Sequence, residues 1–501
     1  MMYKIFLIGL LGIFLFESCY DDKGNYSYHA INEITVKHDF FGDTVLRMYS
    51  FVDTLRVFPE ISTTVNNDPD NYEYEWVAVG GDPTIGGQYT LGKEKDLVYP
   101  ITLPSQRYSV YFKIQDKSTG LTTISSLSLQ LSTLFSQGWL VLGEGDDGRA
   151  QLDMVSTGGE DTTLLKNILQ EVDIQEWGVF VPPYRPAAAL NYIHVGTDKG
   201  TYRLSTSTLL PIEGAHLKWS FYDVSAAGEC VMTEAVQIMG YYRAALVDGN
   251  LYYTELSGQQ ACFFGSPSNH YKGDYDLFPV GDKIGYSVKE RGYATVLYNK
   301  RDGHFVYQQS GYGTPIGYCA DMSDRVGDPF SWKPGYEYVT TLNCHKGAGS
   351  TYTILKDGSD FYLYSYRISY SFGIIKQLMV KMDNVIDLDK AEFFGASNML
   401  SVIYYTVGNK LYGYDFARKK CELLKTFDGY EITLFLSDIL VETSSDYFYI
   451  ALYDPSKPAS TGGMVKKYKV VDDVDHIIVE EEKGSEWKNL CKVKSMAFKT
   501  R

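Results

Sequence analysis

The sequence predicts an all-β protein in which an immunoglobulin-like sandwich is followed by a β-propeller, with seven blades as the favoured count. Three observations lead to this prediction. Aromatic residues form 15% of the 501 residues, and Tyr alone numbers 43, which favours pleated sheet surfaces. Residues 31–133 alternate apolar and polar positions in short runs between turn clusters. Beyond residue 133, one strand–turn–strand unit recurs.

The N-terminus has the pattern of an export signal. Lys4 precedes an apolar run over 5–16, and this run is shorter than the roughly 20 residues that span a bilayer. The residues up to Ser18 and Cys19 resemble a lipobox, although Glu17 is untypical of one. We therefore expect residues 1–18 to be a signal peptide and Cys19 to become the lipidated first residue. The alternative is a signal peptide followed by an unmodified cysteine.

Residues 19–30 form a polar tether in this interpretation. Asp21 and Asp22 directly follow the cysteine, and this resembles the signal that directs Bacteroidetes lipoproteins to the outer face of the outer membrane. A solvated linker without a sorting role is the alternative.

Residues 31–133 are expected to form the sandwich. Trp76 lies in an alternating strand over 72–77 and is expected in the core rather than at a binding site. The Tyr-x-Trp strand that contains Trp76, followed by Tyr108-x-Val110 and Gln115-Asp116, resembles the polycystic-kidney-disease-like (PKD-like) domains.

Residues 134–501 are expected to form the propeller. Each copy has an apolar strand, a Gly-containing turn and an aromatic strand, and successive copies lie 47 to 60 residues apart. This period leaves room for four strands per blade, and the weak first and last copies leave six or eight blades open. The final segment, Val493–Phe498, is expected to close the ring onto the first blade. The copies are centred on Leu140, Ile193, Ala245, Ala294, Ile354, Ile403 and Ile450.

The chain carries no recognisable catalytic or metal-binding motif, so we predict no catalytic residue, metal or cofactor. His-Glu-x-x-His, Gly-x-Ser-x-Gly and Walker patterns are missing. The acidic turn Glu144–Gly148 lacks the later bidentate Glu of a calcium loop. The net charge of −16 argues against sequence-independent nucleic-acid binding. With 62 Asp and Glu residues, however, some carboxylate pair will lie at catalytic distance by chance, and the sequence does not single one out.

The cysteines beyond Cys19 form no Cys-x-x-Cys pair. Cys319 and Cys344 are a conceivable disulfide in an exported protein, and buried single thiols in strands are the alternative. The remaining cysteines are Cys230, Cys262, Cys421 and Cys491.

Three aromatic, loop-like segments interrupt the repeat, at 177–186, 263–276 and 325–336. Insertions in repeat proteins collect on one face, which is often the binding face. We expect these segments either to contact a ligand or to cap the blades and plug the channel. The candidate ligand contacts are Trp177, Tyr184, Arg185, His270, Tyr271, Tyr275, Trp332 and Tyr336.

The order of lipobox, acidic tether, PKD-like domain and Tyr-rich propeller resembles the PKD-like family lipoproteins of Bacteroidetes. These are associated with starch-utilisation-type outer-membrane uptake systems. The resemblance implies a lipid-anchored protein at the outer membrane, facing the exterior, that binds a glycan or peptide nutrient without catalysis or serves as an accessory subunit. Its implied partners are the transporter and the substrate-binding lipoprotein of such a system. The alternatives are a propeller-fold polysaccharide hydrolase or lyase, and a purely structural docking subunit.

Overall fold

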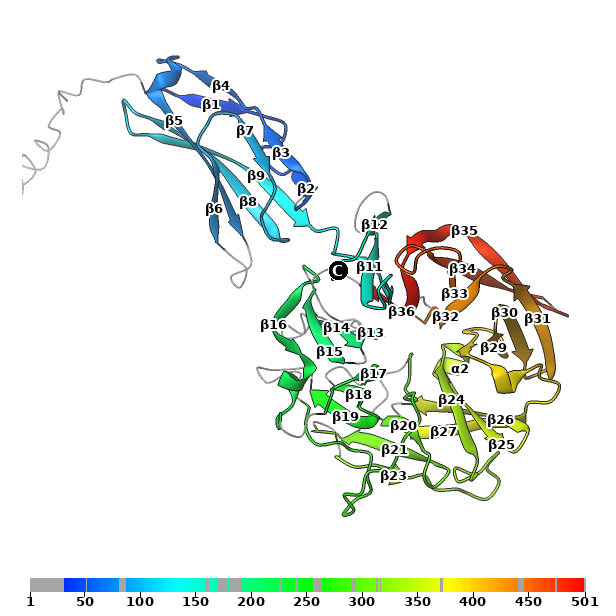
Figure 1. The fold of residues 1–501 in the computed structure, drawn as a ribbon. Coiled ribbons are helices and arrows are strands. Elements are labelled where there is room, and N and C mark those ends of the chain that lie inside the picture. Colours follow the sequence, from blue (N-terminus) through cyan, green and yellow to red (C-terminus); the bar gives the residue numbers. More distant parts are fainter. Residues whose placement is uncertain are drawn as a thin grey trace, which may run out of the picture. The chain divides into compact units, whose positions relative to one another are not determined.

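A computed structural model shows a protein built almost entirely of β-strands (Figure 1). The described residues fall into two compact units that divide between Ser132 and Thr133. None of their helices is long and apolar enough to cross a membrane. The structure describes residues 31–50, 52–80, 87–157, 162–169, 178–180, 192–197, 199–206, 208–224, 228–238, 242–255, 264–289, 294–311, 314–315, 317–369, 373–439, 446–473 and 475–499.

The first unit is the predicted sandwich. One sheet has five strands in the order β2(Val45–Tyr49), β9(Thr122–Ser132), β8(Arg107–Asp116), β5(Tyr72–Gly80) and β6(Gln88–Gly92). The other strands form the pairs β1(Ile34–Lys37) with β4(Glu60–Thr63) and β3(Thr54–Val57) with β7(Leu97–Pro100). The 3₁₀ turn η1(Pro69–Asn71) leads into β5.

Trp76 lies at the centre of the sandwich core, as predicted. Its ring stacks on Phe112 with centroids 4.2 Å apart, and its indole N–H donates to the Glu94 carbonyl at 3.0 Å. Alternate residues of β8 are buried, from Tyr108 to Ile114. The period-two pattern therefore places one face of this strand in the core.

The second unit contains seven sheets in the described residues, arranged as a ring of blades (Figure 1). Blade 1 is β36(Lys492–Lys499), β10(Gly138–Glu144), β11(Ala150–Ser156) and β12(Thr163–Leu165); blade 2 is β13(Gly178–Phe180), β14(Tyr192–Thr197), β15(Gly200–Ser205) and β16(Pro211–His216); blade 3 is β17(Met232–Ile238), β18(Tyr242–Val247) and β19(Asn250–Glu255); blade 4 is β20(Ala294–Asn299), β21(His304–Gly311), β22(Thr314–Pro315) and β23(Ala320–Asp321). Blade 5 is β24(Glu337–Asn343), β25(Ser350–Asp357), β26(Asp360–Ser369) and β27(Gly373–Lys381); blade 6 is β28(Phe393–Ala396), β29(Val402–Val407), β30(Lys410–Asp415) and β31(Lys420–Thr426); blade 7 is β32(Glu431–Ser437), β33(Tyr447–Tyr453), β34(Gly463–Asp472) and β35(Ile477–Leu490). Short helical turns join some of them: η2(Leu217–Ser220), α2(Lys346–Gly349) and η3(Leu388–Lys390).

The ring closes through the last strand of the chain, which confirms the predicted closure. β36 pairs antiparallel with β10, from Gly138 opposite Lys499 to Glu144 opposite Lys492. Two glycines allow this approach, because a Cβ on Gly143 would overlap the Lys492 carbonyl and one on Gly463 would overlap the Cys491 carbonyl. Closure pairs the edge strand that an open ring would expose.

We call one face of the ring the upper face. It carries the hairpins within blades and the connections between blades that are described next. Neighbouring strands in each blade are antiparallel, so the hairpin between the second and third strands opens on the same side as the connection from the outermost strand to the next blade. The upper face therefore includes the β10–β11 hairpin, the β33–β34 connection and the segments at 217–224, 264–279 and 322–336.

Many tyrosines fill the spaces between blades, as the repeat predicted. Tyr405 stacks on Tyr412 with centroids 5.3 Å apart, and Tyr404 and Tyr414 are buried beside them. Burial raises the pKa of Tyr414 to about 12. These rings stabilise the propeller and are not available to a ligand.

Of the two alternatives for Cys319 and Cys344, the structure shows single thiols and no disulfide, because both are free and buried. Burial raises the pKa of each to about 12. The single-thiol alternative fits the other described cysteines, although only Cys421 lies within a strand and the rest lie in connections beside strands. Cys19 and Cys262 are outside the described residues.

Candidate functional site

A groove of about 310 Å³ opens on the upper face, where blade 1 meets blade 7. Blade 1 contributes the β10–β11 hairpin and the residues after β12, and blade 7 contributes the β33–β34 connection. Most of the lining groups can form hydrogen bonds. The lining residues are Gly145, Asp146, Asp147, Arg149, Ala150, Gln151, Asn167, Leu169 and Ser460.

The hairpin on one side of the groove is held by its own turn. The Gly145 N–H donates to the Arg149 carbonyl at 2.8 Å, and Gly148 adopts a φ of +75° that favours glycine. The Arg149 guanidinium lies 3.2 Å from the Asp147 carboxylate, and both side chains are more than half exposed. Asp147 and Arg149 therefore stand at the mouth of the groove with atoms that solvent or a ligand can reach.

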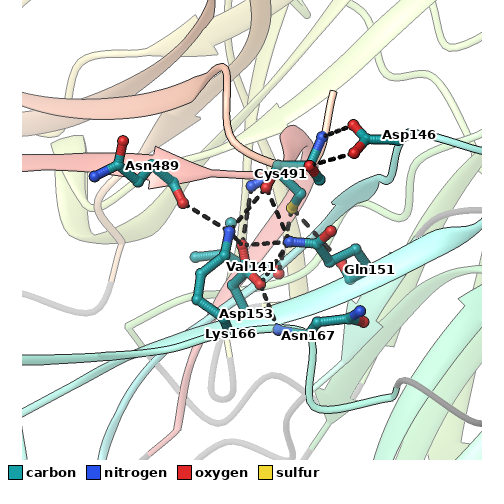
Figure 2. Close-up of polar contacts among 9 residues, drawn as sticks. Val141, Asp146, Gln151, Asp153, Lys166, Asn167, Asn489 and Cys491 are labelled. Atoms are coloured by element: carbon teal, nitrogen blue, oxygen red, sulfur yellow. Dashed lines mark hydrogen bonds and ion pairs between the residues drawn. The ribbon is translucent and has the colours of Figure 1, made fainter. Parts of the chain in front are cut away.

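Asp146 joins the two sides of the groove. Its carboxylate accepts hydrogen bonds from the Ser460 N–H at 2.8 Å and the Ser460 hydroxyl at 2.7 Å (Figure 2). These bonds, the backbone N–H first, lower the pKa of Asp146 below its ordinary value. The acidic turn at Glu144–Gly148 thus serves as a link between blades, since both Asp146 oxygens are engaged by protein.

The groove lies over a buried carboxylate. Asp153 on β11 has no exposed surface and accepts hydrogen bonds from the Gln151 amide at 2.9 Å and the Asn167 N–H at 2.8 Å. It also accepts from the Cys491 N–H at 2.9 Å and pairs with the Lys166 ammonium at 2.9 Å (Figure 2). A buried charge with this many donors is well compensated.

Lys166 extends this network to blade 7. Its ammonium donates to the Ser460 carbonyl at 2.8 Å and to the Asn489 carbonyl at 2.6 Å. The Gln151 amide also donates to the Ser460 carbonyl, at 3.1 Å. The base of the groove is therefore rigid, and a ligand would meet preorganised groups.

Cys491 lies beneath the groove as a buried thiol. Its sulfur contacts the Gln151 carbonyl at 3.5 Å, and burial raises its pKa well above the ordinary value. A thiol held in this form is a poor nucleophile. The described residues contain no group of three His, Cys, Asp or Glu side chains that could hold a metal ion.

The sequence-predicted contacts in the segment at 263–276 are placed at the border of blades 3 and 4. His270 is buried, and its Nδ1 contacts the Asp274 carbonyl at 2.6 Å. The Tyr271 hydroxyl contacts His304 Nε2 at 2.8 Å and accepts from the Asn299 amide at 3.2 Å. Tyr275 is 84% exposed, so of these three only Tyr275 presents a freely accessible ring.

Trp332 does not present its ring to a ligand, which corrects that prediction. It is 3% exposed, and the Lys376 ammonium lies 5.1 Å from its ring centroid. Lys376 in turn pairs with Asp324 and Asp328 at 2.6 Å each. These contacts fold the segment at 322–336 onto blade 5, so Trp332 caps that blade.

Tyr336 also belongs largely to packing, since its ring stacks on Tyr362 with centroids 5.0 Å apart. The segments at 263–276 and 325–336 nevertheless meet in a polar network at blade 4. Asp321 lies 3.0 Å from His304 and 2.6 Å from Lys333. Burial alone would raise the pKa of Asp321, but hydrogen bonds from Lys333 and Tyr271 lower it. Trp177, Tyr184 and Arg185 lie outside the described residues.

Sequence reasoning missed the groove. The turn at Glu144–Gly148 was recognisable as acidic, and Ser460 lies in the longer loop of the last repeat copy. The contact between Asp146 and Ser460 joins positions 314 residues apart. The acidic turn and the loop that contains Ser460 become neighbours only because β36 closes the ring, and neither local pattern predicts this.

Comparison with known proteins confirms the PKD-like resemblance of the N-terminal part. The PKD-like family model matches residues 19–176, and no curated protein matches the chain. A quinonprotein alcohol dehydrogenase-like protein from Bacteroides thetaiotaomicron is 12% identical, with 93% of this chain and 99% of that chain covered and a TM-score of 0.38. The periplasmic gluconolactonase of Pseudomonas aeruginosa is 9% identical, with coverages of 73% and 99% and a TM-score of 0.42. A Synechocystis apocarotenoid oxygenase mutant is 9% identical, with coverages of 74% and 93% and a TM-score of 0.37. Likeness at this level carries no argument about activity. Residues 19–176 are thus similar to the PKD-like family, and this range covers the sandwich and extends into blade 1 of the propeller.

Proposed function

We propose that this chain is a lipid-anchored, cell-surface binding protein that holds a glycan in the groove between blades 1 and 7. The groove carries the proposal: it combines carboxylate, guanidinium and amide groups over a rigid base. Hydroxyl-rich ligands are recognised by such convergent donors and acceptors. The anchor at Cys19 and the association with an outer-membrane transporter rest on the lipobox and on the family resemblance.

Binding is tested with the chain from residue 20 onward and soluble glycans, by affinity electrophoresis and calorimetry. Arg149→Ala and Asp147→Asn remove groups at the mouth of the groove and are expected to weaken binding about tenfold each, because a hydrogen bond to a charged group contributes about 1.5–3 kcal/mol. Arg56→Ala, an exposed arginine in the sandwich, is the matched control. If no glycan binds, or if the groove variants bind as well as the unaltered chain, the proposal is wrong.

The enzyme alternative is tested in the same samples. Tyr271, His304 and Asp321 form a polar cluster, but burial raises the pKa of Tyr271, so its hydroxyl stays protonated at neutral pH and is not available as a general base. We expect no release of oligosaccharides during incubation. Product release that is lost in Tyr271→Phe or His304→Asn would replace the binding proposal with a catalytic one.

Anchoring is tested in cells. Palmitate labelling and membrane retention are expected for the unaltered chain and are lost in Cys19→Ala. Protease treatment of intact cells then shows whether the protein faces the exterior.

A further inference from the structure

The connection from blade 2 to blade 3 presents two aromatic rings to solvent. In this segment, η2 and the two residues after it alternate between core and surface. Leu217 and Phe221 are buried, whereas Trp219 is 51% exposed and Tyr222 is 66% exposed. Tyr and Trp side chains, which combine an apolar ring with a polar tip, are enriched at binding surfaces.

The backbone beneath these rings is held on both sides. His216 Nδ1 accepts a hydrogen bond from the Lys218 N–H at 3.2 Å and so caps the turn. The Phe264 N–H donates to the Ser220 carbonyl at 2.6 Å, and the Tyr222 N–H donates to the Phe264 carbonyl at 3.1 Å. Trp219 is therefore presented by a rigid segment, and a ligand that stacks on it would pay little ordering entropy.

Trp219 is surrounded by a glycine and two cationic side chains. Gly214 lies beside the indole, and a Cβ placed there would be 3.6 Å from Trp219 Cδ1. The Arg203 guanidinium donates to the Gly214 carbonyl at 2.6 Å, and the Lys218 ammonium lies 5.3 Å from the Trp219 ring centroid. The Lys218 ammonium lies over the ring in a cation–π contact, and a flat ring with hydrogen-bond donors this close matches the C–H face and the hydroxyls of a pyranose.

The charge of the protein narrows the class of ligand. The chain carries −16 at pH 7, and Asp146 and Asp147 line the groove on the same upper face. A polyanionic glycan would be repelled by this field. A neutral glycan is recognised by stacking and hydrogen bonds without that cost.

We propose that Trp219, supported by Tyr222, is a stacking platform for a pyranose ring of a neutral glycan chain. This inference rests on the proposed glycan binding and adds a second subsite on the face that carries the groove. Tyr275, which is 84% exposed on the next connection of the upper face, is a further exposed aromatic ring on that face. A glycan chain, rather than a single sugar, is the ligand that would use both the groove and the platform.

The experiment compares Trp219→Ala and Tyr222→Ala with Arg149→Ala in the groove. Phe58→Ala is the matched control, because Phe58 is an exposed ring in the sandwich. The probes are hydroxyethylcellulose, galactomannan, polygalacturonate and a casein hydrolysate, with the corresponding di- and trisaccharides. Affinity electrophoresis gives the affinity, and acrylamide quenching of tryptophan fluorescence reports protection of the ring.

Trp219→Ala is expected to weaken polymer binding about tenfold, with a smaller loss for short oligosaccharides and none for Phe58→Ala. The neutral polymer should protect tryptophan from quenching in the unaltered chain and not in Trp219→Ala. Unchanged polymer affinity in Trp219→Ala, together with a loss in Arg149→Ala, overturns the platform and leaves the groove. Binding of polygalacturonate or casein peptides that depends on Trp219 overturns the neutral-glycan class. If the unaltered chain binds no glycan at all, the proposed function itself fails.

Discussion

Removing the Asp153 carboxylate should open the propeller at its seam. In Asp153→Ala the N–H groups of Asn167 and Cys491 lose their acceptor, and Lys166 loses its ion pair. Each unsatisfied buried donor costs about 1–3 kcal/mol, and breaking a buried pair costs about 3–5 kcal/mol. The Lys166 side chain is 34% exposed, so solvent screens part of the loss. We expect the free energy of unfolding to fall by about 3–4 kcal/mol.

Hydrogen exchange measured by mass spectrometry is the assay, because the sandwich and the propeller can unfold separately. Peptides from β10 and β36 should lose protection by this amount, since the network ties Cys491, which directly precedes β36, to Asp153 of blade 1. Lys166→Met should cost less, because its partner retains three neutral donors.

Asp276→Ala is the matched control, since it breaks an exposed ion pair with Arg301 that is worth at most about 1 kcal/mol. A loss below about 1 kcal/mol in Asp153→Ala, or equal losses in the two aspartate variants, would refute the view that this network closes the ring.

Three further predictions concern the same unit. Burial lowers the pKa of Lys499 to about 8 from its ordinary 10.5, so the unfolded chain binds more protons between these values and stability should rise from pH 8 to pH 10.5. Lys499→Met should abolish that rise and raise the free energy of unfolding at pH 7 by about 2 kcal/mol. Denaturant titration at each pH measures this, and a free energy of unfolding of the unaltered chain that does not change with pH would contradict it. Gly463→Ala should destabilise the propeller by more than about 2 kcal/mol. The thermal midpoint of this variant is compared with that of Gly265→Ala, where a Cβ meets open space and the backbone has no positive φ; equal effects would show that close approach at the seam is unimportant. Among the cysteines that the structure describes, native alkylation followed by mass spectrometry should modify Cys421 first. Rapid labelling of the other described thiols in the folded protein would contradict their burial; those expected to react only after unfolding are Cys230, Cys319, Cys344 and Cys491.

Local patterns were enough to predict most of the fold. Alternation in β5 and β8 identified Trp76 as core because a strand has only two faces. The recurring unit near 50 residues predicted blades, and the apolar strand at Val493–Phe498 had no partner in its own repeat. These features depend on neighbours along the chain, so the sequence exposes them directly.

The candidate site was not predictable in the same way. Aromatic content singled out Trp332, but the ion pairs of Lys376 with Asp324 and Asp328 fold its segment inward. Trp219 was not predicted as a contact because its segment does not interrupt the repeat. Only the exposed fraction of its side chain shows that the ring faces solvent. Whether an aromatic residue caps a blade or faces solvent depends on partners distant in sequence.

The sequence by itself predicted a PKD-like sandwich and a Tyr-rich propeller closed by its last strand; the export signal at the N-terminus stays a prediction. Tertiary structure alone decided where a ligand could bind. Asp146 and Ser460 are 314 residues apart, and they border one groove only because β36 brings the end of the chain back to blade 1. Ring closure is a long-range pairing, and its consequences appear at the seam, where no local pattern records them.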